Sequence, residues 1–109
     1  MSRCYAYTNE DVKCPDLTRQ TWKYTEGQGK GWKDAGAGLV VKSPSSSIVV
    51  VQGEESITGA KDAQSQIFTT YRIEKDLLNG RVHYTSGDGT KALAYGGGSW
   101  RIQSVEKRY

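Results

Sequence analysis

The side chains best suited to catalysis or metal binding are the single histidine, His83, and two cysteines, Cys4 and Cys14. A catalytic serine or cysteine needs a histidine base and a third group that orients it. His83 lies mid-strand and out of phase with Val82 and Tyr84, so we expect a structural or surface histidine. Two cysteines and one distant histidine do not form a zinc site. We therefore expect no metal and no cofactor.

Pairs of carboxylates could instead hydrolyse glycosidic bonds. Glu54 and Glu55 are adjacent in an expected turn, where their side chains point apart. Asp88 stands between two glycines, which is typical of a turn residue. The remaining pair is Glu74 with Asp76. These carboxylates favour a non-catalytic protein over an enzyme.

Exposed aromatic residues are the strongest candidates for ligand binding, because sugar rings stack on aromatic faces while polar neighbours bind the hydroxyl groups. Trp32 lies in a glycine-rich loop, residues 26–38, with Lys30 and Asp34 close by in sequence. Tyr95, which precedes three glycines, is the second candidate. The loop contains neither a GxGxxG motif nor a P-loop ending. The alternative for Trp32 is an anchor that plugs the edge of the fold, whereas Trp22 and Trp100 alternate with apolar residues and are expected in the core.

The spacing of Cys4 and Cys14 favours a disulfide that closes a short loop. Such a bond would stabilise the fold by roughly 2–3 kcal/mol. It would also place the protein in an oxidising compartment, secreted or extracellular. The alternative is a pair of reduced cysteines in a cytoplasmic protein.

Charge and hydropathy restrict the partners. The net charge is only +3, with 15 basic and 12 acidic residues, and the basic residues are scattered instead of forming the stripe typical of nucleic-acid binding. No apolar run reaches the 18 residues of a membrane span. We expect a glycan or protein ligand and no membrane span, and the scattered charge makes nucleic acid a less favoured partner.

The composition predicts an all-β fold in a single domain, residues 1–109. Glycine (13), tyrosine (7) and tryptophan (3) are plentiful, as in pleated strands joined by turns. Strands are expected at residues 4–8, 18–25, 39–42, 48–52, 67–73, 81–85, 91–95 and 99–105, with a further extended segment at residues 56–58. The last three, joined by short glycine turns, predict an antiparallel meander. We expect a small antiparallel sandwich or open barrel of six to eight strands.

Short motifs in residues 48–105 strengthen the binding interpretation. They are Ile57-Thr58-Gly59-Ala60, Tyr71-Arg72-Ile73, Asn79-Gly80-Arg81-Val82-His83-Tyr84 and Ser99-Trp100-Arg101-Ile102. Their order resembles small β-modules of secreted and cell-surface proteins of aquatic protists and invertebrates. The resemblance implies extracellular adhesion or ligand binding and carries over no catalytic residue.

The sequence therefore predicts a non-catalytic binding module, with lectin-like carbohydrate binding through loop aromatics. The alternative is a structural or interaction subunit that docks on a partner protein through strand edges or a surface patch. A secreted effector or toxin, or a basic binder of single-stranded nucleic acid, is the third hypothesis.

Overall fold

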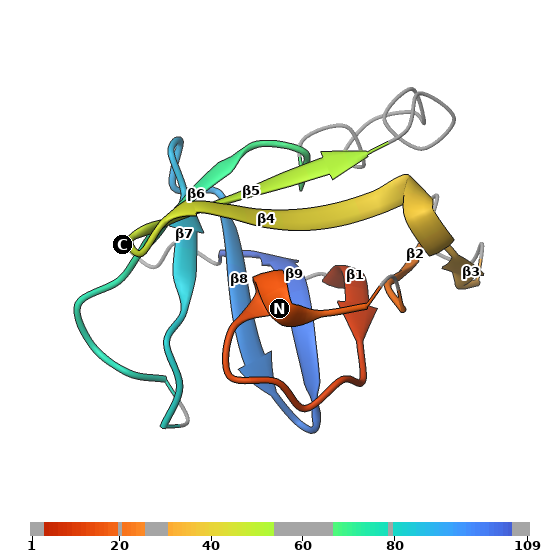
Figure 1. Cartoon of the computed structure of the whole chain (residues 1–109), viewed down its shortest axis with the longest axis horizontal. Helices are drawn as coiled ribbons and strands as arrows, with labels where there is room; N and C mark the ends of the chain where they lie inside the picture. The colour runs from red at the N-terminus through yellow and green to blue at the C-terminus, as the bar shows by residue number, and fades with distance from the viewer. Residues whose placement is uncertain (1–3, 20, 26–30, 54–66, 79, 106–109) are drawn as a thin grey trace.

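The structure is a computed structural model that describes residues 4–19, 21–25, 31–53, 67–78 and 80–105. These residues form nine strands in one antiparallel sheet, ordered β3-β2-β1-β9-β8-β7-β6-β5-β4. The strands are β1 Cys4–Thr8, β2 Lys23–Tyr24, β3 Lys33–Asp34, β4 Leu39–Ser45, β5 Ile48–Gly53, β6 Thr70–Ile73, β7 Tyr84–Ser86, β8 Lys91–Gly96 and β9 Ser99–Ser104; the 3-10 turns are η1 Pro15–Leu17 and η2 Gly36–Gly38. The sheet curls into a half-barrel (Figure 1). The all-β prediction is confirmed, with nine described strands where six to eight were expected.

The core follows from one row of apolar residues that crosses six strands. Directly paired residues in an antiparallel sheet project on the same face. The row consists of Tyr24, Ala6, Ile102, Leu93, Tyr84 and Ile73, on β2, β1, β9, β8, β7 and β6. Burying this row requires a second layer, because the apolar face of a sheet is buried only when another element packs against it.

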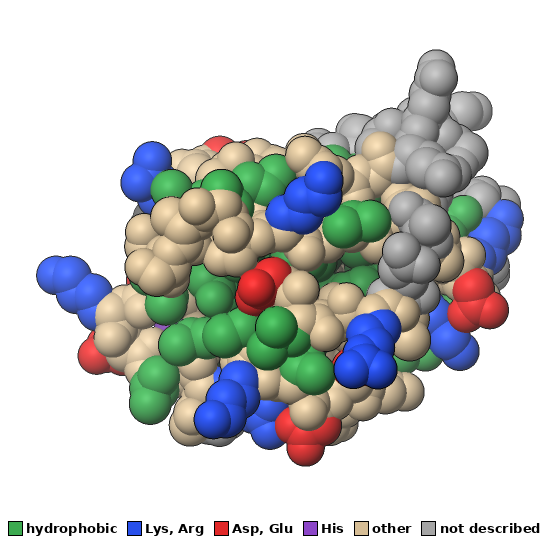
Figure 2. Space-filling view, in the orientation of Figure 1, with side chains coloured by type: hydrophobic (Ala, Val, Ile, Leu, Met, Phe, Trp, Pro, Cys, Tyr) green, Lys and Arg blue, Asp and Glu red, His purple; other side chains and the backbone are tan. Residues whose placement is uncertain are grey.

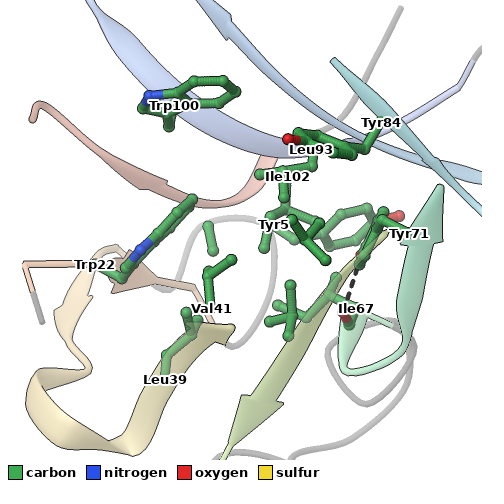
Figure 3. Close-up of a cluster of buried hydrophobic side chains, with 13 residues drawn as sticks. Tyr5, Trp22, Leu39, Val41, Ile67, Tyr71, Tyr84, Leu93, Trp100 and Ile102 are labelled. Carbon is green, nitrogen blue, oxygen red and sulfur yellow. Dashed lines mark hydrogen bonds between the residues drawn. The ribbon is translucent and has the colours of Figure 1, made fainter. Parts of the chain in front are cut away.

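The curl of the sheet provides that second layer. The β4–β5 hairpin runs across β7 and β8 near one end of these strands (Figure 1). It contributes Leu39, Val41, Val49 and Val51, all buried against the same cluster. Figure 3 shows β4 side chains on the opposite side of the cluster from Trp100 and Ile102. The inner face of a single bent sheet thus forms the core.

Trp22 and Trp100 are core residues, as expected, with exposed fractions of 1% and 0%. A buried indole N–H needs an acceptor. Trp22 Nε1 donates to the Thr18 hydroxyl over 2.9 Å, and Trp100 Nε1 donates to the Val12 carbonyl over 2.9 Å. The Trp100 bond ties the segment between β1 and β2 to β9, whereas the Trp22 bond lies within that segment.

The strand expected at residues 18–25 is shorter in the structure, where β2 contains only Lys23–Tyr24. The start of that segment is used elsewhere: Thr18 caps η1, and its hydroxyl donates to the Pro15 carbonyl. The extended segment expected at residues 56–58 lies outside the described residues. The Asn79-Gly80 sequence is typical of a turn, and the residues on either side of it, Leu78 and Arg81, form a bridge, with Gly80 at φ +76°. None of the described helices has the length and hydropathy needed to cross a membrane.

Candidate functional site

A second row of residues, next to the core row, faces outward from the sheet. It runs Asp34, Lys23, Tyr7, Arg101 and Ala94, from β3 through β2, β1 and β9 to β8. Successive residues of a strand point to opposite faces. Because Ala6 and Thr8 are buried on the inner face, Tyr7 between them projects outward. The row therefore places an aromatic ring between two basic side chains, with a carboxylate at one end.

Trp32 packs on this row just before β3. Its ring meets the Tyr7 ring edge to face, with centroids 4.8 Å apart and an interplanar angle of 88°. Trp32 is nevertheless 45% exposed. An edge-to-face contact fixes the orientation of a ring without covering both of its faces. The pair therefore presents an oriented aromatic surface to solvent.

A polar hollow of about 350 Å³ adjoins this aromatic pair. Its described lining consists of Tyr7, Thr8, Asn9, Glu10, Thr21 and Lys23. Lys23 also approaches Asp34 at 4.0 Å. Hydroxyl, amide, carboxylate and ammonium groups thus surround the hollow, and Tyr7 belongs to both the hollow and the aromatic pair.

A closed ring of hydrogen bonds holds the wall of this hollow in place. The Glu10 backbone N–H donates to the Thr8 hydroxyl at 3.4 Å, and the hydroxyls of Thr8 and Thr21 are 2.5 Å apart. The Thr21 hydroxyl donates its hydrogen to the Glu10 carboxylate. In the bond between the two threonines, the Thr8 hydroxyl is therefore the donor and the Thr21 hydroxyl the acceptor. Glu10 also accepts the backbone N–H of Arg19. Such a ring positions its members before any ligand arrives.

The predicted site residues fall in three places. Trp32 and Asp34 lie on the outer face, and Lys30 lies outside the described residues. Tyr95 is on the inner face, because it pairs with the buried Trp100. Its ring meets Trp100 edge to face at 5.6 Å, and the Arg81 guanidinium covers it at 3.8 Å. The structure therefore does not bring Tyr95 together with Trp32.

Sequence reasoning missed Tyr7, Lys23, Glu10 and Thr21. Regular alternation along residues 4–8 places Tyr5 and Tyr7 on one face. A register irregularity between Cys4 and Ala6 breaks that alternation, so Tyr5 is buried and Tyr7 faces outward. A β-bulge re-aims side chains in this way and has no reliable sequence signature here.

A second, larger hollow lies on the other side of the loop between β1 and η1. It has a volume of about 650 Å³, and its described lining is Asp11, Lys13, Cys14, Leu77, Gly80, Arg81 and Val82. Arg81 connects its two walls, since Nη1 donates to the Val12 carbonyl at 3.0 Å and Nη2 pairs with Asp11. We call this hollow the groove.

The expected disulfide between Cys4 and Cys14 is wrong, because both cysteines are free. Cys4 is paired with Gln103 of β9, whereas Cys14 lies beside the Tyr84 hydroxyl of β7. Strand β8 separates these two strands, which places them roughly 10 Å apart at normal strand spacing. A disulfide needs Cα atoms within about 7 Å.

Two described side chains that could take part in proton transfer are His83 and Tyr84. His83 is half-buried, and its Nδ1 is buried without a hydrogen-bond partner among the described residues. Burial, together with smaller contributions from the neighbouring Cys14 and Asp16, raises the pKa of Tyr84 to about 12. Within the described parts of the chain, no three His, Cys, Asp or Glu side chains are grouped to hold a metal ion.

Comparison with protein-family models, with curated proteins and with solved structures gives no match to this chain. The fold itself sets the class: an all-β protein built on one curled antiparallel sheet. Any more specific function has to be argued from the two hollows.

Proposed function

We propose that this protein is a non-catalytic carbohydrate-binding module whose site is the outer-face surface around Trp32. We call this surface the aromatic patch; it comprises Trp32, Tyr7, Lys23, Asp34 and the polar hollow beside them. The observation that carries the proposal is the exposed Trp32 ring, held edge to face against Tyr7, next to that hollow. A sugar needs both an apolar surface for its C–H face and directed polar groups for its hydroxyls.

The polar groups of the patch suit an uncharged or weakly charged sugar. Lys23 and Asp34 are 4.0 Å apart and largely offset each other in charge. Glu10 is held by Thr21 and by the backbone of Arg19. Fixed donors and acceptors of this kind orient a neutral ligand with little loss of side-chain entropy on binding. Binding is therefore expected to depend little on salt concentration.

The test is a glycan array probed with the full chain at two salt concentrations, followed by titration calorimetry with the glycan that binds. We expect Trp32→Ala to weaken binding by at least ~10-fold, the range of a dominant aromatic contact. Lys23→Ala should weaken it less. Lys42→Ala, a change at an exposed lysine of β4, serves as the matched control and should bind as the native chain does.

Two outcomes would overturn the proposal. One is an array without any glycan that binds. The other is a glycan whose affinity is the same for native protein and Trp32→Ala. A melting temperature that falls sharply in Trp32→Ala would instead identify Trp32 as an anchor of the fold.

Docking on a partner protein is the second candidate. One observation favours it: within the described part of the chain, the sheet has two ends, β3 and β4, that pair on one side only. Such edges can accept a strand from another chain. However, β4 ends with Pro44 and exposed polar residues, features that discourage edge pairing. The aromatic patch therefore remains the preferred site, and a silent glycan array would favour docking.

A further inference from the structure

The groove differs from the aromatic patch in its size and in the residues that line it. Its volume of about 650 Å³ falls in the range of pockets that hold small molecules, roughly 300–1,000 Å³. Among the described residues, the groove and the aromatic patch share no lining residue. The loop between β1 and η1 separates the two, with Asn9 and Glu10 on one side and Asp11 and Lys13 on the other.

The walls of the groove are set before a ligand binds. One wall is a tight hairpin in which Leu78 and Arg81 exchange two backbone hydrogen bonds of 2.9 and 3.0 Å. The other wall is held through Val12, whose carbonyl accepts from both Arg81 and Trp100. Arg81 is itself fixed over the Tyr95 ring. A preformed pocket binds its ligand without the cost of ordering loops.

The lining combines apolar surface with excess positive charge. Leu77 is 64% exposed, and Val82 packs against the core cluster. A leucine this exposed beside a hollow offers apolar surface that a ligand can cover. Figure 2 shows hydrophobic side chains gathered on this face, with basic side chains beside them.

The charges of the groove do not cancel. Asp11 is paired with Arg81, which leaves Lys13 as the basic group without a partner among the described residues. An ammonium at the rim of an apolar hollow favours an anion whose apolar part enters the hollow. We propose that the groove binds a small amphipathic carboxylate, with its apolar body on Leu77 and Val82 and its carboxylate at Lys13.

The experiment is titration calorimetry of the full chain with dodecanoate, kept below the concentration at which it forms micelles. Dodecanol and dodecyltrimethylammonium are the neutral and cationic comparisons. We expect saturable binding of one dodecanoate, weaker binding of dodecanol and no saturable binding of the cation. The tryptophan fluorescence should change in parallel, because Trp100 donates to the Val12 wall of the groove.

Two variants localise the site. Lys13→Glu should weaken dodecanoate binding by at least ~5-fold, because an exposed attraction becomes a repulsion. Leu77→Ser should weaken both dodecanoate and dodecanol. Both residues are exposed, so these variants should fold, which circular dichroism can verify. Lys42→Glu is the control and should bind as the native chain does.

The proposal is overturned if dodecanoate does not bind saturably, if the cation binds equally well, or if Lys13→Glu leaves the affinity unchanged. It does not depend on the carbohydrate proposal. Trp32→Ala should keep full dodecanoate binding, and Lys13→Glu should keep any glycan binding. Each of the two sites can therefore fail without the other.

Discussion

The aromatic patch and the groove lie on either side of one loop, yet they differ in what holds them together. The patch is built on the outer row of the sheet and is fixed by local hydrogen bonds among Glu10, Thr8 and Thr21. The groove is fixed by contacts between distant parts of the chain, such as Arg81 with Val12. The patch is therefore a surface property of neighbouring strands, whereas the groove exists only when the fold is complete.

This difference shows how one sheet can separate stability from binding. Tyr7 and Ala6 are adjacent, but Ala6 belongs to the buried inner row and Tyr7 to the row that faces outward. Changes on the outer row should alter ligand binding with little loss of stability. Changes on the inner row or at the groove contacts should lower stability first.

The largest effect is expected from Trp100→Ala compared with Trp32→Ala. Trp100 is fully buried and also holds the Val12 carbonyl, so its removal should lower the free energy of unfolding by about 3–5 kcal/mol. Trp32→Ala loses one half-exposed aromatic contact and should cost less than about 1.5 kcal/mol. Urea unfolding measures both. Equal losses would show that the outer row also belongs to the core.

Arg81→Met should have an intermediate effect. The change removes the bond to Val12 and the cation over Tyr95, and we expect a loss of about 1–3 kcal/mol. Arg72→Met, at an exposed arginine of β6, is the matched control and should stay within about 0.5 kcal/mol of the native chain. If the two variants unfold alike, Arg81 does not connect the walls of the groove.

Asp88, which lies outside both hollows, should make a smaller contribution to stability that is lost at acid pH. Asp88, in the turn between β7 and β8, accepts from the Thr90 hydroxyl and backbone N–H and from the Ser86 hydroxyl, and these bonds lower its pKa from 3.8 to about 2. Its stabilisation is present above pH ~4 and is lost as the pH falls through about 2. Because the carboxylate is exposed, we expect less than about 1 kcal/mol.

Asp88→Asn tests this contribution. The free energy of unfolding is measured between pH 5 and pH 2, the range in which carboxyl groups titrate. It should fall less steeply with decreasing pH in the variant than in the native chain. Comparisons of the patch and the groove made near pH 7 then remain free of this effect. If the free energy of unfolding falls equally with pH in the two proteins, the Asp88 carboxylate does not make this contribution to stability.

The smallest effect is expected from reductant. Both cysteines are free, so reductant should leave the melting temperature unchanged within about 1 °C. Burial raises the pKa of the Cys4 thiol, so the thiols should be counted in denatured, unreduced protein. Two free thiols per chain would agree with a reducing compartment. A count of zero would instead show that Cys4 and Cys14 are joined in a disulfide.

Much of the fold could be predicted from the sequence because its signals are local. Alternation and glycine turns predicted β8 and β9 to within a residue or so, and Asn79-Gly80 indicates a turn where Leu78 and Arg81 form a bridge. Trp22 and Trp100 were expected in the core for the same reason. The predicted start of the strand at residues 18–25 was wrong, because Thr18 caps η1 instead of joining a strand.

The sites were predictable only in part. Trp32 stood out because an aromatic residue among glycines has few neighbours in sequence to bury it. Its partner Tyr7 did not stand out, because a bulge after Cys4 reversed the face expected for it. The groove gave no sequence signal at all, since Lys13 and Leu77 are distant in the chain.

The sequence by itself determined that this chain is all-β, where most of its turns fall and which tryptophans are buried, because those properties depend on side-chain periodicity over a few residues. Tertiary structure alone decided that Tyr95 lies under Arg81, that Cys4 and Cys14 stay apart, and that the loop between β1 and η1 separates two hollows. These depend on strand order and on the curl of the sheet, which bring together residues that no local pattern connects.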